Sequence, residues 1–252
     1  MNLLIDSGNS FIKWALATDE SFIIGSQCLT TAVSSLHEKW ANFGVPARVI
    51  VSNVAGESVA SEIRKAVAVL WQLDTEFIVS SQNCCGLTNS YRKLEQLGVD
   101  RWMAMLAAYR MTQDPVIVVD CGTAVTIDLV NERGLFVGGV IMPGLNTAFQ
   151  SLRADTDAVE EIRDTSTVAS AAALSTEEGV LAGVLFGLAG GIERVVREQS
   201  SEIDRKPVIY MTGGDAEKLV PYLTMPVVLQ PDLVLQGLRV FASKNYRPET
   251  KD

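Results

Sequence analysis

Two short segments of the chain place a glycine two residues after an aspartate, each directly after an apolar run. Asp6 and Gly8 follow "LLI", and Asp120 and Gly122 follow "VIVV". A glycine-containing turn between strands exposes successive backbone N–H groups, which can bind an anion such as a phosphate. A carboxylate beside a phosphate would repel it unless a cation lies between them, and carboxylates bind Mg²⁺ or K⁺ well. The turns therefore predict a polyphosphate site with a cation, although both aspartates could be ordinary turn residues.

Residues near these turns add further donors. Ser10 and Thr123 supply hydroxyl groups, and Lys13 supplies a positive charge. The segment 212–214 (TGG) joins a strand-like run to a helix that starts near Asp215. Paired glycines at such a junction let a ligand approach closely, and we expect that ligand to be the nucleoside. Asp215 could at the same time cap the helix.

A third group of interest is the pair Asp100 and Arg101, at the start of a segment whose apolar residues recur at helical spacing. An aspartate can accept the proton of a hydroxyl that receives a phosphoryl group, and arginine can bind a carboxylate through two parallel hydrogen bonds. Since the chain has a single histidine, His37, an aspartate is the natural candidate for the base. The simpler alternative is that Asp100 only caps the helix.

Composition excludes several other classes of function. The chain has 252 residues, of which 48% are hydrophobic and 20% charged, and its formal net charge is -9. Such an acidic chain is a poor partner for nucleic acid or for an anionic membrane, so we expect neither. The four cysteines lack the C-x-x-C spacing of zinc or redox sites. We expect them to be reduced, buried thiols of a cytoplasmic protein.

The two Asp-Gly turns belong to an internal repeat. Placing Asp6 on Asp120 gives an offset of 114 residues (120 − 6) and brings the flanking apolar runs into register. Each copy predicts three antiparallel strands followed by alternating helices and strands, which is an α/β pattern. We therefore expect two similar domains, residues 1–114 and 115–252, with the active site in the cleft between them.

The predicted elements can be stated by residue range. In the first half we expect strands at 2–6, 11–18, 22–28, 48–53 and 76–80, and helices at 33–41, 58–70 and from 100 onward. In the second half we expect strands at 116–120, 124–131, 135–141 and 207–214, and helices at 146–153, 177–198 and 233–242. The apolar stretch 180–192 is too short to span a bilayer, so we interpret it as part of a buried helix.

In combination, these motifs resemble those of the type III pantothenate kinases, a family within the superfamily of acetate and sugar kinases, heat-shock ATPases and actin. The resemblance covers essentially the whole chain, through the segments 6–10 (DSGNS), 98–101 (GVDR), 120–124 (DCGTA), 138–139 (GG), 143–144 (PG) and 212–214 (TGG). It implies duplicated ribonuclease-H-like domains, as in actin-like ATPases. It also implies ATP-dependent phosphorylation of pantothenate to 4′-phosphopantothenate, the first step of coenzyme A biosynthesis, by a homodimer.

The resemblance further implies roles for single residues. Asp100 would be the general base, and Asp120 would hold a monovalent cation, K⁺ or NH₄⁺, in addition to Mg²⁺ carried with ATP. The ATP site would comprise Asp6, Ser7, Gly8, Asn9, Ser10, Phe11, Ile12, Lys13 and Thr123. The pantothenate site would comprise Tyr91, Gly98, Val99, Asp100, Arg101 and Thr176.

Some alternatives stay open at this point. The family usually has threonine where Ser10 stands and asparagine where Ser175 stands, and Ser175 also fits an N-cap with Glu178 in a capping box. A kinase or phosphatase of the same superfamily that acts on a sugar or a polyphosphate is one rival function, against which the segment 98–101 argues. A regulatory accessory factor with weak or no turnover is another, against which the intact Asp100 argues.

Overall fold

The computed structural model describes residues 1–154 and 169–243, which form two compact units. The first unit contains residues 1–113, 134–136 and 232–243, and the second contains 114–154, except 134–136, and 169–231. We expected a boundary after residue 114, and the units divide one residue earlier. Two later segments, 134–136 and 232–243, join the first unit instead of the second. Parts of the expected second domain, residues 155–168 and 244–252, lie outside the described residues.

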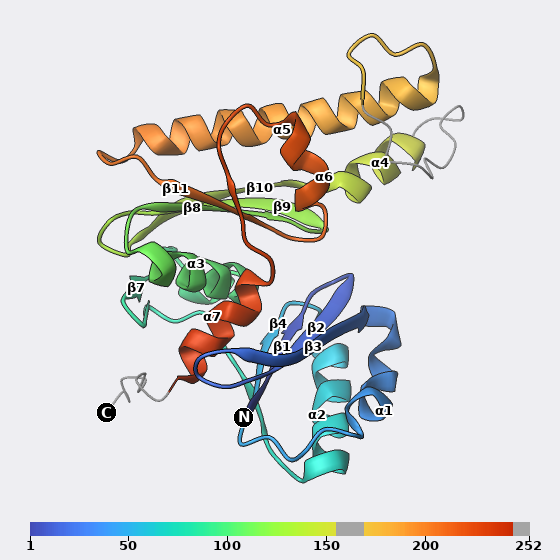
Figure 1. The fold of residues 1–252 in the computed structure, drawn as a ribbon, viewed down its shortest axis with the longest axis vertical. Helices are drawn as coiled ribbons and strands as arrows, with labels where there is room; N and C mark the ends of the chain where they lie inside the picture. The colour runs from blue at the N-terminus through green and yellow to red at the C-terminus, as the bar shows by residue number, and fades with distance from the viewer. Residues whose placement is uncertain (155–168, 244–252) are drawn as a thin grey trace. The chain divides into compact units, whose positions relative to one another are not determined.

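The first unit is built on a five-stranded sheet in the order β3-β2-β1-β4-β5 (Figure 1). Its strands are β1 (Asn2–Ser7), β2 (Phe11–Ala17), β3 (Phe22–Leu29), β4 (Val49–Asn53) and β5 (Thr75–Phe77). β1, β2 and β3 are antiparallel neighbours, whereas β4 and β5 run parallel to β1. A short antiparallel hairpin, β6 (Asn83–Cys84) and β7 (Leu87–Thr88), follows along the chain.

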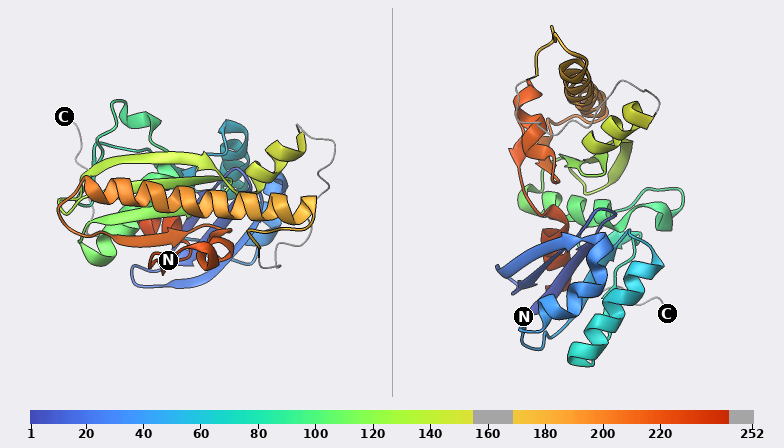
Figure 2. Two further views of the ribbon diagram at one scale, coloured as in Figure 1. Left: turned by 90° about the horizontal axis from the view of Figure 1, so that it is seen from above. Right: turned by 90° about the vertical axis from the view of Figure 1, so that its right-hand side faces the viewer.

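The helices of the first unit lie on both sides of this sheet (Figure 2). They are η1 (Thr30–Ser35), α1 (Leu36–Trp40), α2 (Glu57–Trp71), η2 (Leu94–Gln96), α3 (Val99–Thr112) and α7 (Leu233–Ala242). The core on the side of α1 and α2 contains Trp14 and Trp40, whose rings meet edge to face with centroids 5.9 Å apart. On α7, a Cβ at Gly237 would overlap the backbone of Met103, so glycine lets α7 pack closely on α3.

The second unit repeats the sheet of the first, in the order β10-β9-β8-β11-β12. Its strands are β8 (Val116–Cys121), β9 (Ala124–Val130), β10 (Phe136–Pro143), β11 (Val208–Thr212) and β12 (Val228–Leu229). Its helices are α4 (Leu145–Ala154), α5 (Thr176–Ser201), α6 (Ala216–Leu219) and η3 (Val220–Tyr222). β8 lies antiparallel to β9 and parallel to β11, as β1 does to β2 and β4.

The long helix α5 runs along one face of the second sheet (Figure 2). Leu181, Leu185, Leu188 and Ile192 recur at helical spacing and are buried against the apolar side chains of β8 and β9. By length and composition alone this helix could cross a bilayer. Its burial against the sheet instead identifies it as the core helix of this unit, as the sequence predicted for residues 180–192.

The two units confirm the internal repeat and show where it is imperfect. β1 and β8 begin 114 residues apart (116 − 2), but β2 and β9 begin 113 apart (124 − 11). The turn of the second copy is therefore one residue shorter. The single helix predicted at 33–41 is in fact the end of the 3₁₀ segment η1 followed by the short helix α1, which ends at Trp40.

Candidate active site

The first predicted phosphate loop is the turn between β1 and β2. The Gly8 N–H donates to the Phe11 carbonyl at 3.0 Å, and a Cβ at Gly8 would lie 3.3 Å from the same oxygen, so a glycine suits this tight turn. Thr30 holds the loop from outside, since its hydroxyl donates to the Gly8 carbonyl at 2.7 Å and its N–H to the Ser10 carbonyl at 3.0 Å. Asn9 and Ser10 are exposed at the tip. The loop is thus fixed at its base and open to a ligand at its tip.

Two of the predicted ATP residues, Asp6 and Lys13, are direct cross-strand partners, so their side chains emerge on one face of the sheet. The Lys13 ammonium also forms an ion pair with Asp232, with Nζ and Oδ1 3.1 Å apart. Asp232 is the N-cap residue of α7 and has a left-handed backbone, with φ 57°. No local pattern in the sequence pointed to Asp232, because the pairing spans 219 positions along the chain.

The predicted base, Asp100, lies at the N-terminus of α3. The N-cap residue is Gly98 and the helix begins at Val99, so Asp100 is the second residue of the helix and not its cap. Its Oδ1 accepts a hydrogen bond from the Arg101 backbone N–H at 2.8 Å. A Cβ at Gly98 would lie 2.5 Å from this oxygen, so the glycine makes room for the carboxylate.

The environment of Asp100 changes its acidity. Burial raises the pKa of the carboxyl, while the N–H and the positive charge of Arg101 partly oppose that shift. A carboxylate whose ionised form is less stable than usual is a stronger base, which is the property that proton transfer from a hydroxyl requires.

Arg101 is held in a defined position, and it is only 7% exposed. Its Nη1 donates to the Tyr91 hydroxyl at 3.0 Å, and its guanidinium carbon lies 5.7 Å from the centroid of the Tyr91 ring. The Phe136 ring stacks on Tyr91 with centroids 5.5 Å apart and lies 6.0 Å from the same guanidinium carbon. The structure therefore brings Tyr91 and Arg101 together and adds Phe136, to which no sequence motif pointed.

The loop before α3 is shaped by buried polar contacts. Asn89 is 4% exposed; its Oδ1 accepts from the Tyr91 N–H at 2.9 Å, and its Nδ2 donates to the Leu94 carbonyl at 3.3 Å. The Ser90 hydroxyl donates to the Phe136 carbonyl. These bonds fix the backbone that carries Tyr91 toward Arg101.

The second predicted phosphate turn follows β8 in the second unit. Asp120 is followed by Gly122, whose N–H donates to the Ala124 carbonyl at 3.0 Å. The Thr123 carbonyl accepts from the Gly144 N–H at 3.0 Å and from the Thr147 hydroxyl at 2.7 Å. The turn is thus braced by the start of α4.

The predicted 212–214 segment lies beside this turn. Thr212 pairs with Asp120 in the parallel ladder of β8 and β11. Gly213 has φ 93°, and a Cβ there would lie only 2.5 Å from the Asp120 carboxylate. Asp215 donates its backbone N–H to the Cys121 carbonyl at 3.0 Å, but its side chain makes no capping bond. The two strand ends form a glycine-lined surface around Asp120.

Thr176, the remaining predicted pantothenate residue, is exposed at the start of α5. Ser175 is the N-cap, and its hydroxyl accepts from the Glu178 N–H at 3.2 Å. The Glu178 carboxylate accepts from the Leu174 N–H at 3.0 Å. Thr176 belongs to the second unit, whereas Tyr91 and Asp100 belong to the first, so a shared pantothenate site stays a prediction.

The oxygen atoms around the second turn suit a cation that needs few ligands from the protein. Within residues 1–154 and 169–243, no three His, Cys, Asp or Glu side chains cluster as a metal site. Asp120 therefore does not belong to a cluster of three or more such side chains in the described part of the chain. This arrangement fits an ion that takes its other oxygen ligands from phosphates and water, as K⁺ or Mg²⁺ beside ATP would.

The repeated sheet order defines the duplicated ribonuclease-H-like fold of the actin-like ATPases, which confirms the predicted fold class. The activator of the 2-hydroxyisocaproyl-CoA dehydratase from Clostridium difficile, solved with bound ADPNP, shares this fold at a TM-score of 0.54 and 10% identity, over 96% of this chain and 92% of that one. The ethanolamine utilization protein EutJ from Carboxydothermus hydrogenoformans does so at a TM-score of 0.54 and 15% identity, over 95% and 89% of the two chains.

Sequence comparison identifies the kind of kinase. The family model for type III pantothenate kinase matches residues 2–198. The type III pantothenate kinase of Nitrosomonas eutropha is 35% identical over 243 residues, which cover 95% of this chain and 93% of that protein. That of Nitrosococcus oceani is 35% identical over 246 residues, which cover 94% and 92%. The chain belongs to the type III pantothenate kinase family and is a kinase, as its motifs indicated.

Proposed function

We propose that this kinase transfers the terminal phosphoryl group of ATP to the primary hydroxyl of pantothenate, with Asp100 as the general base. Family membership supports pantothenate as the substrate. The observation that carries the assignment of residues is the cluster at the N-terminus of α3, where a carboxylate with a raised pKa adjoins an ordered arginine. The product, 4′-phosphopantothenate, would enter coenzyme A biosynthesis in the cytoplasm.

The acceptor side of the mechanism uses Arg101 and Asp100. The guanidinium of Arg101 binds the carboxylate of pantothenate, and its contacts with Tyr91 and Phe136 keep it in one orientation before the substrate arrives. Asp100 accepts the proton of the hydroxyl as the phosphoryl group is transferred. Most of the rate enhancement in such a reaction comes from positioning and electrostatics, so an ordered arginine contributes directly.

The nucleotide side uses the two turns of the repeat. Backbone N–H groups at the exposed tip of the first turn, around Asn9 and Ser10, bind phosphates from the first domain, together with the Ser10 hydroxyl and Lys13. Thr123 contacts ATP from the second domain. Asp120 would hold a monovalent cation, which together with Mg²⁺ on the nucleotide would offset the phosphate charge.

A coupled assay with ATP, Mg²⁺ and pantothenate, with and without K⁺, tests this function. We expect steady formation of ADP that depends on pantothenate. Good turnover with a sugar and none with pantothenate would reject the assignment. Binding of ATP and pantothenate without turnover would instead favour the regulatory accessory role.

We also propose that the active form is a homodimer, as the family resemblance implies. Multi-angle light scattering at micromolar concentration should give twice the 27.3 kDa mass of the chain. A monomeric mass for a preparation with full activity would contradict this proposal.

A further inference from the structure

Two adjacent cysteines occupy the hairpin of β6 and β7. Cys84 pairs with Leu87, so Cys85 and Gly86 form a two-residue turn, and their φ angles are 49° and 88°. Turns with two positive φ angles favour Asn-Gly or Gly-Gly, because most other side chains are strained there. A strained residue of this kind often has a role beyond folding, and cysteine brings chemistry that asparagine lacks.

The two thiols differ in environment. Cys84 is 2% exposed, whereas Cys85 is partly exposed. The Cys84 thiol donates a hydrogen bond to the Cys85 sulfur, with the sulfurs 3.8 Å apart. This bond and the charge of Arg110 lower the pKa of Cys85, against the effect of burial, whereas burial raises the pKa of Cys28 and Cys121. Of Cys28, Cys85 and Cys121, Cys85 is thus the thiol that most readily becomes a reactive thiolate.

We propose that Cys84 and Cys85 form a reversible oxidation site, in which a peroxide joins the two residues by a disulfide. The Cys85 thiolate attacks one oxygen of hydrogen peroxide, the O–O bond breaks, hydroxide leaves, and Cys85 becomes a sulfenic acid. The Cys84 thiol then loses its proton and attacks the Cys85 sulfur. An S–S bond forms, the S–O bond breaks and water leaves. The two cysteines lose two electrons, and the peroxide gains them.

Such a disulfide would be easy to reduce. Neighbouring Cα atoms are only about 3.8 Å apart across a trans peptide, whereas ordinary disulfides join Cα atoms roughly 4.4 to 6.8 Å apart. Strained and accessible disulfides are the labile ones, so cellular thiols would restore the reduced pair. The site therefore suits a reversible response to peroxide.

The hairpin is in contact with the segment that carries Phe136. The Thr88 N–H donates to the Gly134 carbonyl at 2.8 Å, and a Cβ at Gly134 would overlap the Gly86 carbonyl. Closing a disulfide must change the 85–86 turn and displace this contact. Phe136, two residues further on, stacks on Tyr91. Oxidation should therefore weaken the Arg101 cluster, an effect that rests on the proposed pantothenate site.

The chemistry is tested on the full-length enzyme by peptide mass analysis after treatment with hydrogen peroxide. We expect the peptide that contains both cysteines to lose two hydrogen atoms and to regain them with a thiol reductant, while Cys28 stays alkylatable. Overoxidation of Cys85 without a cross-link, or equal oxidation of Cys28, would overturn the proposal. This readout does not depend on which substrate the enzyme uses.

The functional consequence is tested by kinetics. Oxidation should raise the KM for pantothenate by about three- to tenfold and leave the KM for ATP nearly unchanged. Cys85→Asn, which suits the turn, and Cys84→Ser should abolish the reversible change, whereas the control Cys28→Ser should keep it. Equal peroxide sensitivity in Cys85→Asn and the unchanged enzyme would overturn the link, even if the disulfide forms.

Discussion

Asp100 carries the proton transfer of the proposed mechanism, and replacing it by asparagine tests that role. The asparagine side chain could still accept the Arg101 N–H, so the fold should persist, but it cannot take up the hydroxyl proton. We expect Asp100→Asn to lower kcat by roughly 10² to 10⁴-fold. Some activity should remain, because positioning supplies much of the rate. Steady-state kinetics measure the effect, and a folded variant with near-normal kcat would remove Asp100 from the mechanism.

The raised pKa of Asp100 also predicts a dependence on pH. The base must be ionised, so kcat/KM should fall as the pH is lowered. The apparent pKa of this fall should lie above 3.8, the ordinary pKa of an aspartate. The native state holds the Asp100 proton more tightly than the unfolded chain, so this residue's contribution to stability is full below that value and is lost as pH rises through the raised pKa. Asp100→Asn should therefore melt at a higher temperature at neutral pH, with a smaller difference in acid. A lower melting temperature at neutral pH would contradict this prediction.

Arg101 should respond differently, because its role is to bind and not to transfer a proton. Arg101→Lys keeps the charge but loses the planar fork and its contacts with the stacked rings of Tyr91 and Phe136. We expect the KM for pantothenate to rise about tenfold or more, with a smaller fall in kcat. Initial-rate kinetics with each substrate varied in turn measure the split. If kcat falls and the KM for pantothenate is unchanged, Arg101 does not bind the substrate carboxylate.

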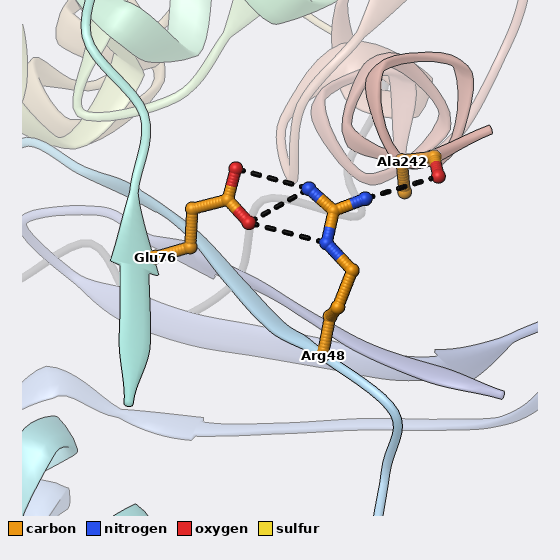
Figure 3. Close-up of polar contacts among 3 residues, drawn as sticks. All are labelled: Arg48, Glu76 and Ala242. Carbon is orange, nitrogen blue, oxygen red and sulfur yellow. Dashed lines mark hydrogen bonds and ion pairs between the residues drawn. The ribbon is translucent and has the colours of Figure 1, made fainter. Parts of the chain in front are cut away.

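Among the elements, the C-terminal end of α7 is hydrogen-bonded to an arginine at the start of β4. Arg48, just before β4, donates to both carboxylate oxygens of Glu76 on β5, with the shortest distance 2.7 Å, and to the Ala242 carbonyl at 3.2 Å (Figure 3). The last carbonyls of a helix lack partners within it, so this bond serves as a C-terminal cap. Because the ion pair is about 40% exposed, we expect Arg48→Ala to cost only about 1 kcal/mol of stability.

Chemical denaturation of Arg48→Ala measures this cost. Lys65→Ala is a matched control, since the Lys65 side chain is 67% exposed and forms an ion pair with Glu62, within the same helix α2, at 2.6 Å. Its cost should stay below about 0.5 kcal/mol. Equal effects of the two substitutions would show that the Ala242 cap adds no stability.

Elements with strong local patterns were predictable, and those that depend on distant partners were not. The range of α7 was predicted without error, because apolar residues at helical spacing define it. The hairpin of β6 and β7 has two-residue strands, too short for any periodicity, and it was missed. Phe136 and Asp232 also escaped notice as site residues. Each takes its position from contacts with residues far away along the chain, which no local pattern encodes.

At the scale of the whole molecule, the repeated Asp-Gly turns predict that the activity of the enzyme depends on a monovalent cation. Asp120 beside a phosphate turn needs a cation to avoid repelling its ligand. We expect K⁺ or NH₄⁺ to activate the enzyme, and Asp120→Asn to raise the KM for ATP more than that for pantothenate. Assays in Na⁺ and in K⁺ buffers measure the dependence. Unchanged activity without K⁺ or NH₄⁺ would reject the cation role of Asp120.

The close fit of α7 on α3 has a consequence for synthesis of the chain on the ribosome. Met103 meets Gly237 only after the entire second unit has been translated, although nearly all other residues of the first unit emerge earlier. Leu233 and Leu238 of α7 are fully buried in the finished protein. Until α7 has been synthesised, the surface of α3 that it covers must therefore stay exposed in the nascent first unit. A chain released before residue 233 should be a preferred substrate for chaperones and proteases.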